Sequence, residues 1–180
     1  MKRTTHSIAS LAVFALLACL PGLAQADDLK AGDDAPDFSL QGTDGETHAL
    51  KDYHGKQVVV VAWFPKAKTG GCTKECKSLK ESGKALREFD VAYFTASCDT
   101  PEFNKEFATE LGLDYPILSD PTKGVAKAYG VVHEGREVPE RWTFYIGTDG
   151  KLLHIDKEMN TDGHGAEIAA KLKELGVKQK

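Results

Sequence analysis

The chain has 180 residues with a formal net charge of −4, and 28% of its residues are charged. Its lysines and acidic residues are interspersed, which is typical of a solvated surface and excludes the basic stripe of a nucleic-acid-binding protein. The length suits one domain with a single core.

Residues 1–26 have the pattern of a secretory signal, with a basic start, an apolar run from Ile8 to Leu20 and small residues before an expected cleavage after Ala26. The apolar run is too short to anchor the protein across a bilayer. We therefore expect an exported, periplasmic protein with one domain over residues 27–180. The alternative is a lipoprotein in which Cys19 becomes the lipidated first residue.

The first elements of this domain are predicted to be a hairpin, a buried strand and a helix. Residues 35–50 contain two short alternating runs around Thr43-Asp44-Gly45, which favours a β-hairpin. Residues 56–64 form an almost unbroken apolar, β-branched run, as in a central strand buried on both faces. Apolar residues then recur at helical spacing over residues 72–89, although Gly83 weakens this helix.

The remaining chain alternates strands with helices. The expected elements are a strand over 91–97, a helix opened by Thr100-Pro101 and stopped by Gly112, a short strand, a helix with Asp120 as cap and Pro121 in its first position, a hairpin over 141–156 and a final helix over 165–176. This order predicts a three-layer α/β domain around a central mixed sheet. Cys72 and Cys98 then both follow the carboxyl ends of strands, where open α/β sheets build their sites.

Three cysteines remain after the expected cleavage, namely Cys72, Cys76 and Cys98. So few exclude a disulfide-dense scaffold, and the odd number leaves at least one thiol unpaired in a monomer. Cys72 follows two glycines at a helix start, where unpaired N–H groups and the helix dipole favour a thiolate. The Thr69 hydroxyl is expected to donate to this sulfur or to an oxygen bound beside it.

Cys76 lies one helical turn after Cys72, so their Cα atoms are about 6 Å apart, within the disulfide range. Their Cβ atoms are too far apart for an unstrained bond in an intact helix, so the first turn must unwind before the bond forms. A permanent bond would close almost no loop and stabilise little. The spacing therefore favours a disulfide that forms and breaks during a reaction.

A metal site is the competing interpretation of the same pair. Two cysteines on one helical face can bind copper or zinc together with a distant histidine. The available histidines do not form a ligand-spaced cluster; they are His48, His54, His133, His154 and His164.

The motif Pro65-x₃-Thr69-x₂-Cys72, at a strand-to-helix junction and with Arg141 opening a later strand, resembles the active-site motif of the peroxiredoxins. The segments APDFSL, DGETHALKDYHGKQVVVVAWFPKAKTGGCTKEC, DTPEFNKEFATELGLDYPILSDPTKGVAKAYGV and RWTFYIGTDGKLLHI follow the family's order along nearly the whole domain. The chain is most similar to the PrxQ, or bacterioferritin-comigratory-protein, branch. The resemblance implies a thioredoxin-like fold, with a central mixed β-sheet flanked by helices and an N-terminal β-hairpin, and a thiol peroxidase without a cofactor.

The resemblance also implies a role for each residue of the motif. Cys72 is the expected peroxidatic thiolate, which attacks hydrogen peroxide or an organic hydroperoxide and becomes a sulfenic acid. Thr69 and Arg141 are expected to hold the thiolate and stabilise the leaving oxygen, and Pro65 to shield the pocket. Cys76 is the expected resolving thiol, forming a transient Cys72–Cys76 disulfide that a thioredoxin-type protein reduces.

Two departures from the branch leave the resolving thiol open. The chain has Thr69-Gly70-Gly71-Cys72 where the branch usually has Thr-Pro-Gly-Cys, and the usual resolving cysteine stands five residues after the peroxidatic one, not four. Cys98 and an external thiol are therefore alternatives to Cys76. A monomer is expected, with a dimer possible, because no cysteine near the C-terminus is available to reach across a dimer.

The alternative function is a copper chaperone that resembles the Sco family and uses Cys72 and Cys76. That family has a histidine at a position equivalent to about Glu140-Arg141, where the arginine of this chain would repel copper. A disulfide reductase of thioredoxin type is a third hypothesis, but its Cys-x-x-Cys motif is missing.

Overall fold

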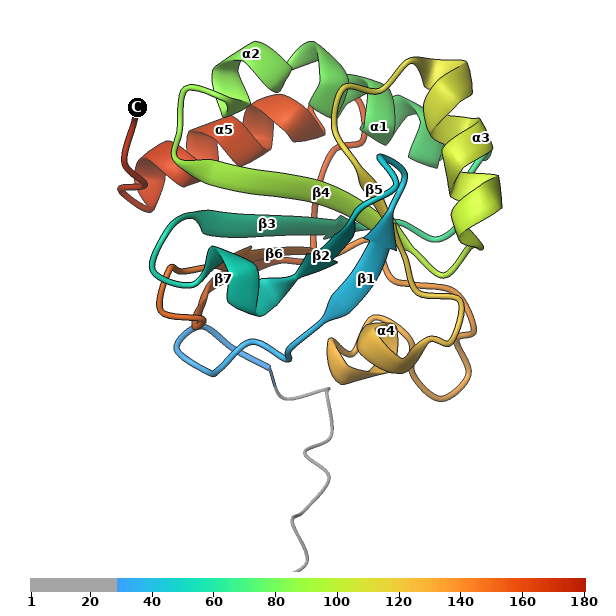
Figure 1. Ribbon diagram of the computed structural model, residues 1–180, viewed down its shortest axis with the longest axis horizontal. Coiled ribbons are helices and arrows are strands. Elements are labelled where there is room, and N and C mark those ends of the chain that lie inside the picture. The colour runs from blue at the N-terminus through green and yellow to red at the C-terminus, as the bar shows by residue number, and fades with distance from the viewer. Residues whose placement is uncertain (1–28) are drawn as a thin grey trace, which may run out of the picture.

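The computed structural model describes residues 29–180, so the expected signal segment and Cys19 lie outside the described residues. Seven strands form one mixed sheet in the order β2-β1-β5-β4-β3-β6-β7 (Figure 1). The strands are β1 (Ser39–Gly42), β2 (Thr47–Ala49), β3 (Val58–Trp63), β4 (Val91–Ser97), β5 (Ile117–Ser119), β6 (Thr143–Ile146) and β7 (Leu152–Asp156). The helices are the 3₁₀ helix η2 (Leu50–Tyr53) and the α-helices α1 (Gly70–Glu81), α2 (Gly83–Leu86), α3 (Pro101–Leu111), α4 (Gly124–Ala128) and α5 (His164–Glu174).

The predicted central strand is confirmed. Every residue of β3 is buried, and the strand pairs in parallel with β4 and antiparallel with β6. Its β-branched, apolar sequence fits this position because a strand covered on both faces has no polar side. The predicted N-terminal hairpin is also present, since β1 and β2 pair antiparallel.

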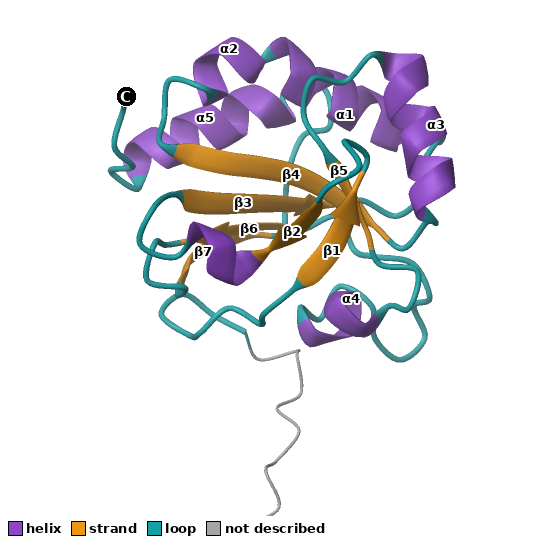
Figure 2. Ribbon diagram, viewed as in Figure 1, coloured by secondary structure: helices purple, strands orange, loops and turns teal. Residues whose placement is uncertain are grey.

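Helices cover the sheet on both faces, which confirms the three-layer α/β prediction. Helices α1, α2, α3 and α5 lie on one face, and α4 lies on the other (Figures 1 and 2). On the first face, Leu79, Leu86 and Leu172 pack with residues of β3, β4 and β6. On the second face, Trp63, Tyr129 and other large side chains form a separate core. The seven-stranded sheet therefore separates two apolar layers.

The helix after β3 begins and ends at different residues from those predicted. It starts at Gly70, so Cys72 occupies the third helical position, and it stops at Glu81 before the short helix α2. The Ser82 N–H still bonds the Ser78 carbonyl across this break, which keeps the two helices in one layer. Cys72 thus lies inside the first helical turn.

The prediction that Asp120 caps a helix with Pro121 in its first position is wrong. Helix α4 begins at Gly124, because Pro121 lies in a turn and Lys123 adopts a left-handed backbone with φ 60°. The Asp120 carboxylate still accepts the Ala126 N–H at 2.8 Å, so it binds the backbone of α4 although Asp120 itself precedes the helix. In α3, by contrast, Thr100 and Pro101 open the helix as predicted.

Within residues 29–180, none of the helices combines the length and apolar character needed to cross a membrane.

Candidate active site

The loop between β3 and α1 is fixed to the neighbouring strand and helix. The Ala67 N–H donates to the Asp99 carboxylate at 2.8 Å, just beyond the end of β4. Lys68, which has a positive φ of 63°, extends its ammonium group to Glu110 at 2.7 Å and to Glu106 at 3.0 Å on α3. These contacts hold the start of α1 at the carboxyl edge of the parallel strands.

Thr69 is the N-cap residue of α1, and its side chain bonds within the loop. Its hydroxyl donates to the Lys66 carbonyl at 2.9 Å and makes no cap hydrogen bond. The hydroxyl therefore does not donate to the Cys72 sulfur here, and its expected contact with an oxygen bound beside that sulfur stays a prediction. Pro65 is half-buried in the same loop. The N–H groups of the first helical turn thus have no side-chain cap, and they give the sulfur a positive electrostatic environment.

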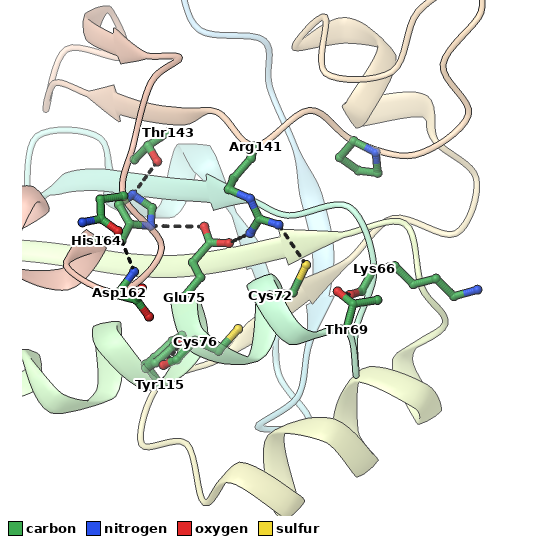
Figure 3. Close-up of polar contacts among 12 residues, drawn as sticks. Lys66, Thr69, Cys72, Glu75, Cys76, Tyr115, Arg141, Thr143, Asp162 and His164 are labelled. Carbon is green, nitrogen blue, oxygen red and sulfur yellow. Dashed lines mark hydrogen bonds and ion pairs between the residues drawn. The ribbon is translucent and has the colours of Figure 1, made fainter.

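Cys72 is fully buried in the first turn of α1, and a guanidinium group lies directly beside its sulfur. Arg141 approaches from the segment before β6 and donates from Nη2 to the Cys72 Sγ at 3.3 Å (Figure 3). A Cβ on Gly71 would come within 3.3 Å of the same guanidinium nitrogen, so the glycine leaves room for this close approach. Arg141 therefore places a fixed positive charge directly against the buried sulfur.

Glu75, one turn further along α1, holds the other side of the guanidinium group. Its carboxylate is fully buried, and its Oε2 pairs with the Arg141 Nη1. Burial opposes the charge of Arg141, but the neighbouring Glu75 and Cys72 outweigh it and raise the pKa of the guanidinium. Arg141 is therefore a permanent cation that bridges an acid and a thiol.

The second oxygen of Glu75 faces a buried histidine from the last helix. The Glu75 Oε1 lies 3.1 Å from the His164 Nδ1, and the His164 Nε2 lies 2.9 Å from the Thr143 hydroxyl oxygen (Figure 3). The sequence predicted no role for Glu75 or Thr143, and it presented His164 only as a candidate metal ligand. The available signal was that Glu75 follows Cys72 by three residues, on the same side of a helix.

Cys76 is also fully buried, but its neighbours are different. It packs in the apolar cluster with Phe107 and Ile117, and the Tyr115 hydroxyl donates to its carbonyl oxygen at 3.0 Å. Burial, helped by the negative charge of Glu75, raises the pKa of the Cys76 thiol to about 12. At neutral pH this thiol is protonated and unreactive for as long as the helix is intact.

Cys98 lies in the other apolar layer. Its side chain packs against the core that contains Trp63 and Tyr129, whereas Cys72 and Cys76 belong to the cluster between the sheet, α1 and α3. Burial and the nearby Asp120 raise the pKa of its thiol to about 12. Cys98 therefore packs in a different apolar cluster from the pair on α1.

The geometry does not support the copper alternative. Among residues 29–180, no three side chains of the histidine, cysteine, aspartate or glutamate types are grouped so as to hold a metal ion. His164, which lies beside the α1 site, is already in contact with Glu75 and Thr143.

A buried thiol at a helix start, held by an arginine at the edge of a thioredoxin-like sheet, defines a cysteine-dependent redox enzyme. The family model described as AhpC/TSA family matches residues 31–155. Peroxiredoxin Bcp of Escherichia coli is 36% identical over 152 residues, covering 81% of this chain and 97% of the relative. Peroxiredoxin Bcp of Bacillus subtilis is 32% identical over 156 residues, covering 83% and 99%.

Solved structures show the same fold. Peroxidoxin BcpB of Mycobacterium tuberculosis is 31% identical with a TM-score of 0.73, covering 81% of this chain and 97% of its own. A cysteine-to-serine mutant of PrxQ from Xylella fastidiosa superimposes with a TM-score of 0.75 at 23% identity, covering 82% and 98%. The chain belongs to the AhpC/TSA family of peroxiredoxins and is a thiol peroxidase.

Proposed function

We propose that Cys72 is the peroxidatic residue, and the observation that carries this assignment is the 3.3 Å contact between its sulfur and Arg141. The thiolate attacks one oxygen of the peroxide, the O–O bond breaks and an S–O bond forms. Cys72 becomes a sulfenic acid, and the leaving oxygen takes up a proton to form water or an alcohol. Arg141 and the N–H groups of the first turn of α1 face the charge that moves onto that oxygen.

Cys76 is the proposed resolving residue. Its thiol loses a proton and attacks the Cys72 sulfenic acid, whose hydroxyl leaves as water while a disulfide forms. In the intact helix this attack is blocked, because Cys76 is buried, its thiol has a pKa of about 12 and the two Cβ atoms are a full turn apart. The first turn of α1 must therefore unwind, which exposes Cys76 and makes its thiol easier to ionise.

Reduction of this disulfide needs an external dithiol, and a thioredoxin-type protein fits the chemistry. Cys98, the remaining cysteine of the described part of the chain, lies in the other apolar layer and offers no second thiol on this face of the sheet. The proposed substrates are hydrogen peroxide and organic hydroperoxides.

The test is stopped-flow mixing of the reduced protein with stoichiometric hydrogen peroxide, followed by peptide mass mapping. We expect rapid consumption and a Cys72–Cys76 link, whereas Cys72→Ser consumes no peroxide above the rate without enzyme. Full turnover by Cys72→Ser would refute the assignment. A mapped Cys72–Cys98 link would leave the peroxidatic role intact and transfer the resolving role.

We also propose that the protein is exported to the periplasm, on the basis of the pattern in residues 1–26. Cell fractionation with mass measurement of the mature N-terminus tests this proposal. A chain that starts after Ala26 supports it, a lipidated Cys19 selects the lipoprotein route, and an uncleaved cytoplasmic chain contradicts it.

A further inference from the structure

We propose that His164 is a positioning residue for the peroxidase reaction: it fixes the Glu75 carboxylate, which in turn holds the Arg141 guanidinium against Cys72. The inference rests on the proposed role of Cys72. Four contacts carry it, and they run from Thr143 through the buried imidazole and carboxylate to the guanidinium and the sulfur (Figure 3).

The two oxygens of Glu75 have separate partners. Oε2 pairs with the Arg141 Nη1, and Oε1 lies 3.1 Å from the His164 Nδ1. A carboxylate that is held from both sides cannot rotate freely. The plane of the guanidinium group is then fixed too, because Arg141 uses one nitrogen for Glu75 and the other for Cys72.

The orientation of the imidazole follows from its neighbours. His164 Nδ1 lies 3.1 Å from the Glu75 Oε1, within ion-pair range, although the two atoms make no hydrogen bond. A hydroxyl group both donates and accepts, so Thr143 satisfies Nε2 at 2.9 Å whether or not that nitrogen carries a proton. Thr143 thereby fixes the ring orientation in which Nδ1 points at the carboxylate.

The fold brings the ring to this place through a close crossing of two helices. His164 is the first residue of α5, and the next residue, Gly165, donates its N–H to the Ser78 hydroxyl on α1 at 3.0 Å. A Cβ on Gly165 would collide with the Ser78 carbonyl, so only glycine allows the helices to approach this closely. The surface acid nearest in sequence, Asp162, pairs with Lys74, so Glu75 is the acid that contacts the ring.

The Glu75 Oε1 is buried without a hydrogen-bond donor, and loss of the imidazole would also remove the ring nitrogen that lies 3.1 Å from it. An unsatisfied buried carboxylate oxygen is costly, and rotation of the carboxylate toward a second guanidinium N–H relieves that cost. This rotation takes the Arg141 Nη2 away from the sulfur. We therefore expect the Cys72 sulfur to lose its contact with the guanidinium and to react more slowly, although neither cysteine has been changed.

The experiment compares His164→Leu with His164→Asn in the full chain. Leucine removes the polar atom beside the Glu75 carboxylate, whereas asparagine places an uncharged amide group there. We measure the alkylation rate of Cys72 by iodoacetamide at neutral pH and the single-turnover rate with hydrogen peroxide. We expect His164→Leu to lower both rates roughly ten- to a hundredfold, and His164→Asn to restore them to within about threefold of the wild type.

The outcomes separate this inference from the peroxidase assignment, because alkylation of Cys72 needs no peroxide. A leucine variant that alkylates at the wild-type rate, or an asparagine variant as slow as leucine, overturns the positioning role. If the leucine variant does not fold, Thr143→Val replaces it, with Thr143→Ser as the matched control that keeps the hydroxyl. If Thr143→Val is alkylated and reacts with peroxide more slowly than Thr143→Ser, the positioning role is supported. Equal rates for the two variants overturn it.

Discussion

Cys72 and Cys76 lie one turn apart on the same helix and are equally buried, yet their surroundings give them opposite chemistry. Cys72 touches a guanidinium group and the uncapped start of α1. Cys76 faces Tyr115 and apolar side chains, and the pKa of its thiol is raised to about 12. Burial alone therefore does not decide whether a thiol is reactive; the charge that is buried with it decides.

The same comparison fits the proposed order in which the two thiols act. In that proposal Cys72 reacts in the folded state, whereas Cys76 becomes a nucleophile only after the turn between them has opened. Oxidation of Cys72 is then expected to precede exposure of Cys76.

The largest effect should come from removing the second thiol, that of Cys76. Cys76→Ser should consume one equivalent of peroxide at the wild-type rate and then stop, so that steady-state turnover with a dithiol reductant falls close to zero. Cys98→Ser is the matched control and should turn over normally, because Cys98 lies in the other apolar layer. Peroxide consumption with and without reductant distinguishes these outcomes, and normal turnover by Cys76→Ser would transfer the resolving role elsewhere.

Replacing Arg141, the charged neighbour of Cys72, should give the next largest effect. Arg141→Lys keeps the charge but loses the planar fork that contacts Glu75 and Cys72 together. We expect kcat/KM for peroxide to fall roughly a hundredfold, as for loss of one donor to a developing oxyanion. Stopped-flow kinetics measures this change, and a lysine variant with wild-type kcat/KM would show that the fork geometry is dispensable.

A smaller effect should follow from loosening the surroundings of Cys76. Tyr115→Phe removes the hydroxyl that donates to the Cys76 carbonyl, so the free energy of unfolding should fall by about 1 kcal/mol. Opening of the turn should become easier by the same amount, and disulfide formation about fivefold faster. Quenched-flow mapping of the disulfide tests this prediction, and peroxide attack at Cys72 should be unchanged.

The last prediction concerns stability at alkaline pH. Folding raises the pKa of the Cys76 thiol from its ordinary value of 9.0 to about 12, so the folded state holds this proton more tightly than the unfolded state. The contribution of this proton to the free energy of unfolding is fully present below the ordinary pKa of 9.0. It is lost as the pH rises through about 12. The Tm difference between the reduced wild type and Cys76→Ala should therefore shrink across this window, and a constant difference would contradict the burial effect.

Much of the fold was predictable from local sequence pattern. The apolar run that became β3, the Thr100-Pro101 helix start and the hairpin around Thr43-Asp44-Gly45 all depend on periodicity and backbone preference, which act over a few residues. The start of α4 was not predictable in this way, because a left-handed Lys123 and a turn at Pro121 override the local capping signal.

By itself, the sequence determined the order of strands and helices, the helix start beside Cys72 and the four-residue spacing of the two thiols. Local pattern did not show which thiol meets a cation, since Arg141 is 69 residues from Cys72 in the chain; only the family resemblance pointed to Arg141, and the tertiary structure brings it to the sulfur. It also brought Thr143, Glu75 and His164 together from three separate elements. The reason is physical: periodicity reports which face of an element is buried, but not which polar groups are buried against each other.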